Sequence, residues 1–353
     1  MRLQPILVVA GLLAFGVARA QDKLTVYGSV DQAAVRISNL GGTGVSRLDA
    51  GTTQPDRIGF EGSEDLGDGL RAEFALEHGF FTDTGGSVSE TSFFNRHATV
   101  GLSGSFGSVA LGHQPDLMFD WVGKTSNGIL LSNFYAFHPG NFDVLANTFQ
   151  FDNAIRYDTP AIGGLKLGGL YGFGENPAGS SVGRNYSLGA NYVEGSLHVA
   201  TAYWVQNNRT LRGFAPFASA SGLPASGVMD QVKNAGVGAS YRLDNFTVNS
   251  VYTQTKMTAG ATSATMRNLD LGLSYAMSAA ITLNGGYTRS TLKDVDWNTW
   301  SLMGMYHFSK RTQVYAVGTF QQASNGQAAV INGAGASSDR NQNVVGAGIH
   351  HSF

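Results

Sequence analysis

Apolar and polar residues alternate along most of this chain. The clearest cases are segments 185–192 and 268–275, where leucine, alanine or tyrosine occupies every second position, with asparagine, serine, glycine or aspartate between. A period of two is typical of β-strands, because successive side chains point to opposite faces of a sheet. The pattern therefore predicts an all-β protein whose strands have one apolar and one polar face.

The same pattern predicts sixteen strands in a single unit. Tight turns, such as Leu66–Gly69 and Asp244–Asn245, follow every second strand, and longer loops, such as 207–231 and 323–342, lie between them. This arrangement is typical of bacterial transmembrane β-barrels, whose even strand number leaves both chain ends on the periplasmic side. The predicted strands are 23–37, the two arms of a hairpin within 55–81, 92–103, 107–114, 153–159, 165–174, 184–193, 196–206, 233–243, 246–256, 266–277, 281–291, 297–308, 312–321 and 343–353.

One long segment, 115–152, interrupts this regular series of strands. It shows neither sustained alternation nor a helical period, and structureless segments of this length are usually functional. It also carries too many aromatic residues for a loop that extends into water. We expect it to fold inward and narrow a pore formed by the strands; a plain external loop or a surface lid is the alternative. The aromatic residues are Phe119, Trp121, Phe134, Tyr135, Phe137, Phe142, Phe149 and Phe151.

Composition favours a transmembrane barrel. Charged residues make up 14% of the chain, and the mean hydropathy is −0.06. A chain with these values is too apolar to be a disordered protein and too polar to be a bundle of membrane helices. Strands with one face toward lipid and the other toward water average to such values. A secreted β-sandwich or solenoid could share this composition, but a sandwich of this many strands must protect its edges, whereas closure removes them.

The first residues predict export. Met1 and Arg2 form a short positive end, 3–17 is an apolar run too short to span a bilayer as a helix, and Ala18–Ala20 is an A-x-A cleavage site. We interpret 1–20 as a signal peptide and 21–353 as an outer-membrane β-barrel. Removal of the signal leaves 21 of the 23 basic residues against 25 acidic ones, so the formal charge changes from −2 to −4, which does not favour nucleic-acid binding. The chain contains no cysteine, and we expect neither a metal nor a cofactor.

Five motifs occur in order along the mature chain. They are LTVYGSVDQA, DRIGFEGSEDLGDGLRAEFALEHGF, FFNRHATVGLSGSFGSVALGHQ, NAIRYDTPAIGGLKLGGLYGFGE and the C-terminal VVGAGIHHSF. Together they resemble the trimeric general porins of Gram-negative bacteria, in particular the betaproteobacterial type. The resemblance implies a sixteen-stranded antiparallel transmembrane β-barrel that forms a homotrimer among outer-membrane lipid and lipopolysaccharide, with the third external loop folded into the lumen. Phe353 looks like the signal read by the barrel-assembly machinery.

The resemblance also implies a constriction where basic residues of the wall face acidic residues of the inserted loop. Arg57 and Arg96 match wall arginines of the family, and Arg156 has the inward parity of a third. Two departures from the family reduce the positive charge, because His113 and Gln150 stand where arginine is common. The alternative for any one charge is a rim residue or an ion pair within the wall. The expected constriction residues are Arg57, Arg96, Arg156, His113, Glu61 and Glu77 on the wall and Asp116, Asp120 and Asp143 on the loop, with Arg71 in the lower vestibule.

These residues predict a diffusion porin for small hydrophilic solutes and ions, with a weak to moderate anion preference. In a narrow passage the low-dielectric walls focus the field, so a few fixed charges outweigh the net charge. A substrate-selective channel and an adhesin or structural barrel remain the alternatives. No enzyme is expected, because the scattered histidines accompany neither G-x-S-x-G nor H-E-x-x-H.

Overall fold

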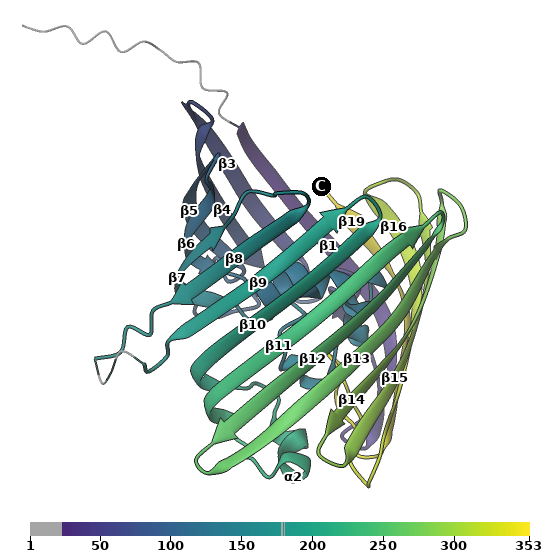
Figure 1. Cartoon of the computed structure of the whole chain (residues 1–353). Helices are drawn as coiled ribbons and strands as arrows, with labels where there is room; N and C mark the ends of the chain where they lie inside the picture. The colour runs from purple at the N-terminus through teal and green to yellow at the C-terminus, as the bar shows by residue number, and fades with distance from the viewer. Residues whose placement is uncertain (1–22, 178, 180) are drawn as a thin grey trace, which may run out of the picture.

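The computed structural model describes residues 23–177, 179 and 181–353, and the predicted signal peptide lies outside them. The described chain forms an antiparallel sheet that closes on itself, because β1 (Lys23–Leu40) pairs with the last strand, β19 (Asn341–Ser352) (Figure 1). No helix among the described residues is long and apolar enough to cross a membrane.

The barrel has sixteen strand positions, as the sequence predicts. Its sheet contains 17 strands, but β2 (Thr43–Ala50) and β3 (Arg57–Gly67) pair with successive parts of β1 and fill one position. The remaining strands are β4 (Leu70–Gly79), β5 (His97–Gly104), β6 (Gly107–Gln114), β7 (Phe151–Asp158), β8 (Leu165–Gly172), β9 (Asn185–Glu194), β10 (Leu197–Thr210), β11 (Val228–Leu243), β12 (Phe246–Ala259), β13 (Thr262–Ala276), β14 (Ile281–Leu292), β15 (Val295–His307) and β16 (Thr312–Ala323), with a separate hairpin of β17 (Val330–Ile331) and β18 (Gly335–Ala336).

The main differences between the sequence pattern and the structure concern β2, the start of β5 and the length of two loops. The pattern does not predict β2, a short strand whose alternation is obscured by the charged pair Arg47 and Asp49. It begins the strand predicted at 92–103 too early, because β5 starts only at His97. It also predicts longer loops where β12 and β13, and β14 and β15, continue almost to a two-residue turn. Short connections therefore occur at both ends of this barrel.

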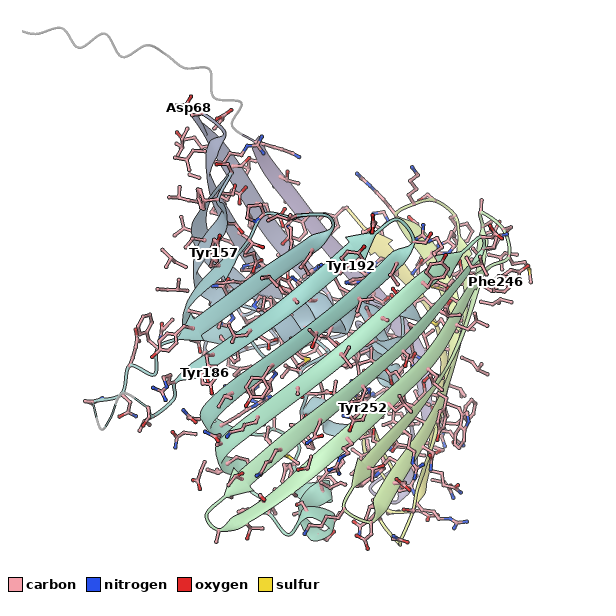
Figure 2. The ribbon with its side chains drawn as sticks, viewed as in Figure 1. Asp68, Tyr157, Tyr186, Tyr192, Phe246 and Tyr252 are labelled. Carbon is pink, nitrogen blue, oxygen red and sulfur yellow. The ribbon has the colours of Figure 1, made fainter. Side chains whose placement is uncertain are left out.

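Apolar side chains cover the outer surface. Leu188 is 60% exposed and Leu271 is 50% exposed, whereas the residues between them on the same strands are more buried. Figure 2 shows Tyr186 and Tyr192 toward opposite ends of β9, with Phe246 at the start of β12, beside the turn that follows β11. Aromatic side chains at strand ends are typical of the interfaces between a membrane and water.

The inserted loop, residues 115–150, packs against the inner wall. Asn127 hydrogen-bonds to β13 and β14, Asn133 to β16, and Tyr135 to Asp49 of β2. A segment that contacts the buried face of strands around most of a closed barrel lies inside it, as Figure 1 also shows. Its short helical elements are η1 (Met118–Val122), η2 (Gly123–Thr125), α1 (Asn127–Leu130), η3 (Phe134–Ala136) and η4 (Pro139–Asn141); η5 (Ala215–Phe217) and α2 (Ala218–Ser221) belong to the loop after β10.

Candidate pore constriction

Two arginines converge on one carboxylate in the wall. Arg57 begins β3, Arg96 immediately precedes β5, and Glu77 lies in β4 between these strands. The Nε atom of Arg96 is 2.5 Å from Oε1 of Glu77, and the Nε atom of Arg57 is 3.4 Å from Oε2. The hydroxyl of Tyr27 in β1 donates to Oε2 at 3.0 Å. Two guanidinium groups and one carboxylate leave this cluster with a surplus of positive charge.

Arg96 reaches Glu77 because it precedes the strand. Val100 and Leu102, which share its parity, are exposed on the outer face, so strict alternation would place Arg96 outside. Its backbone N–H instead donates to the carbonyl of Glu77 at 3.2 Å, and its side chain follows the loop rather than the alternation of β5. Parity therefore does not assign the orientation of this residue.

Arg156 links the inserted loop to the wall. In β7 its Nη2 atom lies 2.9 Å from Oδ2 of Asp158, and its Nη1 atom contacts Oδ2 of Asp120 in the loop. The guanidinium carbon also lies 5.9 Å from the ring centroid of Trp121, within the range of a cation–π contact. With two carboxylates around one guanidinium, this second cluster carries a surplus of negative charge.

A cavity of about 500 Å³ lies between these charged groups and the end of the barrel that carries the termini. Glu61 of β3, His97 of β5, Asp120 and Arg156 all line it. Arg71 lies near the β3–β4 turn and is exposed. The cavity is therefore bounded by the wall on one side and by the start of the inserted loop on the other.

His113 is paired within the wall. It lies in β6 with its Nδ1 atom 2.6 Å from Oδ1 of Asp152 at the start of β7. An arginine at this position would carry a permanent positive charge.

In the described part of the chain Asp116 and Asp143 form no ion pair with Arg57, Arg96 or Arg156, and their place in the constriction stays a prediction. Both are buried, with 2% and 1% exposure. Asp116 accepts the backbone N–H of Phe119 at 3.1 Å, and burial raises its pKa to about 7. Asp143 contacts β12 and β13 on the far side of the barrel through Thr253 and Asn268. Charge alone does not reveal which side of an irregular loop faces the wall.

Glycines of the wall, which the strand pattern does not single out, receive the loop. A Cβ atom at Gly168 would lie 2.5 Å from the ring of Trp121, and one at Gly272 would lie 2.3 Å from Oδ1 of Asn127. A Cβ atom at Gly236 would likewise lie 2.7 Å from the sulfur of Met118. The loop therefore approaches the wall where the inward residue has no side chain. The available signal was the recurrence of glycine at inward positions of the strands.

Comparison with known proteins identifies the family. A family model described as Gram-negative porin matches residues 7–326. The chain belongs to this porin family. It is 29% identical over 373 residues to outer membrane porin protein 32 of Delftia acidovorans, and the match covers 99% of both chains. It is 28% identical over 405 residues to an outer membrane porin protein of Bordetella pertussis, and that match covers 98% of this chain and 99% of the relative.

A solved structure has the same fold. The anion-selective porin from Comamonas acidovorans superposes with a TM-score of 0.80 at 24% identity and covers 94% of this chain and 100% of its own. The present porin is thus an outer-membrane channel with a sixteen-stranded antiparallel barrel.

Proposed function

We propose that this porin passes small hydrophilic solutes and ions by diffusion, with a weak to moderate anion preference. The observation that carries the proposal is the pair of arginines, Arg57 and Arg96, around the single carboxylate of Glu77. Inside a low-dielectric barrel such a surplus of positive charge attracts anions more strongly than a charge on the outer surface does.

The preference is weak because the other charges oppose it. Arg156 is offset by Asp120 and Asp158, and Glu61 adds a further carboxylate to the cavity. The passage therefore has a positive wall at β3–β5 and a negative region near the loop. The name of the structural relative from Comamonas acidovorans, an anion-selective porin, supports the sign of the preference.

The proposal includes processing and assembly. Residues 1–20 are the cleaved signal, and the barrel forms a homotrimer in contact with lipid and lipopolysaccharide. Exposed apolar side chains on the neighbouring strands β1 and β19, such as Val26 and Ile349, support burial against a partner or lipid. A related fold, OmpT of Vibrio cholerae, has been solved in a trimer form. Phe353 is the residue through which the barrel-assembly machinery recognises the chain.

Zero-current potentials across a KCl gradient test the selectivity. We expect a modest anion preference in the unmodified channel and a smaller one in Arg57→Ala and Arg96→Ala. Arg289→Ala is the matched control, because its guanidinium lies on the exposed face of β14, paired with Asp296. Clear cation selectivity of the unmodified channel, or no shift in either wall variant, would contradict the assignment. Stepwise conductance also separates a diffusion channel from an adhesin or structural barrel, which would be silent.

A further inference from the structure

A histidine of the inserted loop lies between two aspartates inside the protein. The Nδ1 atom of His138 is 2.5 Å from Oδ2 of Asp143, which lies in the same loop. Its Nε2 atom is 3.0 Å from Oδ1 of Asp270, which lies in β13 of the wall. All three side chains are at most 1% exposed. Because both ring nitrogens face carboxylate oxygens, both must donate, and the ring is therefore an imidazolium when both aspartates are ionised.

The neighbours of this cluster come from several strands and are neutral. Thr253 of β12 and Asn268 of β13 donate to Asp143 at 2.6 and 3.1 Å. Thr288 of β14 donates to Asp270 at 2.6 Å, and the backbone N–H of Asn127 donates to the other oxygen of Asp270 at 3.0 Å. The loop and three wall strands therefore meet at one buried ionic group.

Other charges reach the cluster only through space. Arg209 of β10 interacts electrostatically with Asp143, but no hydrogen bond joins them. The direct contacts described for the cluster from β12 and β14 are the hydroxyls of Thr253 and Thr288. His138 is therefore the counter-charge in direct contact with both carboxylates.

We propose that His138, Asp143 and Asp270 form an ionic latch that holds the inserted loop on the wall and so sets the width of the channel. This inference rests on the proposed channel function, but its main test does not. The latch joins the middle of the loop to the side of the barrel that lies away from Arg57 and Arg96. It acts on the position of the loop rather than on the charges of the constriction.

The latch is intact across neutral pH. Burial alone would lower the pKa of His138, but Asp143 and Asp270 raise it to about 10. Burial opposes ionisation of Asp143, but the imidazolium outweighs it and lowers the pKa of that carboxyl. The contribution of His138 to the free energy that holds the loop on the wall is therefore complete below pH 6.5, its ordinary pKa. This contribution declines above pH 6.5 and is lost as the pH rises through about 10. The contribution of Asp143 is present above 3.8 and is lost only at lower pH.

Removing the imidazolium changes this pH dependence. In His138→Gln the buried carboxylates of Asp143 and Asp270 remain near each other without a contacting counter-charge. One of them must therefore be protonated while the loop is bound, whereas both can ionise in water once the loop is released. Low pH then favours the bound loop and rising pH favours its release. A variant that merely lost shape complementarity would show no such dependence.

A reporter thiol measures release of the loop directly. The chain has no cysteine, and Ser126 is buried in the loop at 1% exposure, so Ser126→Cys provides a single thiol that is protected while the loop is bound. The probe is a charged maleimide applied to the inserted protein between pH 5 and 9. With His138 present we expect slow labelling that, once corrected for thiolate content, is constant between pH 5 and 6.5 and accelerates only above pH 6.5, where the contribution of His138 declines. With His138→Gln we expect labelling at least about tenfold faster at pH 6.5, because the buried carboxylates lack a counter-charge, and a rate that already rises between pH 5 and 6.5.

Two further variants complete the test. His307→Gln in β15 replaces a histidine whose ring Nε2 lies 3.1 Å from the hydroxyl of Thr282, away from the latch, and is expected to label like the unmodified protein. Asp270→Asn, added to His138→Gln, removes one of the two carboxylates, and we expect this double variant to label slowly. If His138→Gln alone does not insert into the membrane, we expect the double variant to restore insertion. Three results would each overturn the latch: equal labelling rates with and without His138, a fast rate in His138→Gln that does not depend on pH between 5 and 6.5, or no rescue by Asp270→Asn. If labelling changes while no conductance is seen in any variant, the latch stands and the channel function fails.

Discussion

Replacing Gly272 with alanine tests whether the inserted loop depends on glycines in the wall. A Cβ atom at this position of β13 would lie 2.2 Å from Oδ1 of Asn249 and 2.3 Å from Oδ1 of Asn127. Since ordinary contact requires at least 3.4 Å, both side-chain amides must move by about 1 Å in a close-packed interior. Asn127 belongs to the loop, so the new methyl group acts directly on the contact between loop and wall.

The expected loss follows from the hydrogen bonds that this movement breaks. Asn249 donates to Oδ1 of Asn127 and to the carbonyl of Thr125, both at 3.0 Å and both at buried positions. A hydrogen bond contributes about 1 kcal/mol net, and a buried polar group left without a partner costs about 1–3 kcal/mol. The free energy that holds the loop on the wall should therefore fall by about 2–4 kcal/mol, which is at least about 30-fold in the equilibrium between bound and released loop.

Hydrogen exchange of the loop amides measures this change. The N–H groups of Leu130 and Leu131 donate within the loop at 2.9 Å, and their exchange should accelerate at least about 30-fold in Gly272→Ala. Gly285→Ala is the matched control, because its Cβ atom would make an ordinary contact, 3.6 Å from Leu302. Similar exchange rates in the two variants would show that the wall glycines do not position the loop.

Two further predictions concern the C-terminus and pH. Phe353 exchanges two backbone hydrogen bonds of 3.1 Å with Gly28, and a Cβ atom at Gly28 would lie 2.2 Å from its ring. Phe353→Ala should therefore lower both membrane insertion and the yield of heat-sensitive trimer at low expression. Unimpaired insertion of this variant would contradict the role of Phe353 in assembly. Unmodified protein that runs only as a monomer on an unheated gel would contradict the homotrimer. Burial raises the pKa of Asp116 from 3.8 to about 7, so its contribution to stability is complete below pH 3.8 and declines as the pH rises through about 7. Asp116→Asn should therefore raise the melting temperature at pH 8 and not at pH 4, and an equal change at both pH values would contradict this reasoning.

The regular strands were predictable because the membrane imposes a strict alternation on them. Leu269, Leu271 and Leu273 face outward, and Asn268 and Asp270 face inward, as the period of two indicates. The alternation was not readable in β2, where charged residues face the interior next to a single exposed leucine. The regularity of a strand is thus visible only where lipid demands apolar residues over several successive outward positions.

The wall charges were only partly predictable. The sequence predicts strands at Arg57, Glu77 and Arg156, and these residues lie in β3, β4 and β7. It could not show that Asp143 is buried on the far side, since an irregular loop has no period that relates sequence position to direction. The role of these residues as a constriction stays a prediction, which the selectivity measurements test.

The latch and the wall arginines act on different properties of the channel. Arg57 and Arg96 contact Glu77 on the wall, and the loop contributes no partner to that contact. His138 binds carboxylates on the other side of the lumen, whereas on the arginine side the same loop contacts Arg156 through Asp120. Two groups that share no partner contribute independently to a measured free energy. The sign of the ion preference therefore belongs to β3–β5, and the position of the inserted loop belongs to β12–β14 and to the glycines beside them.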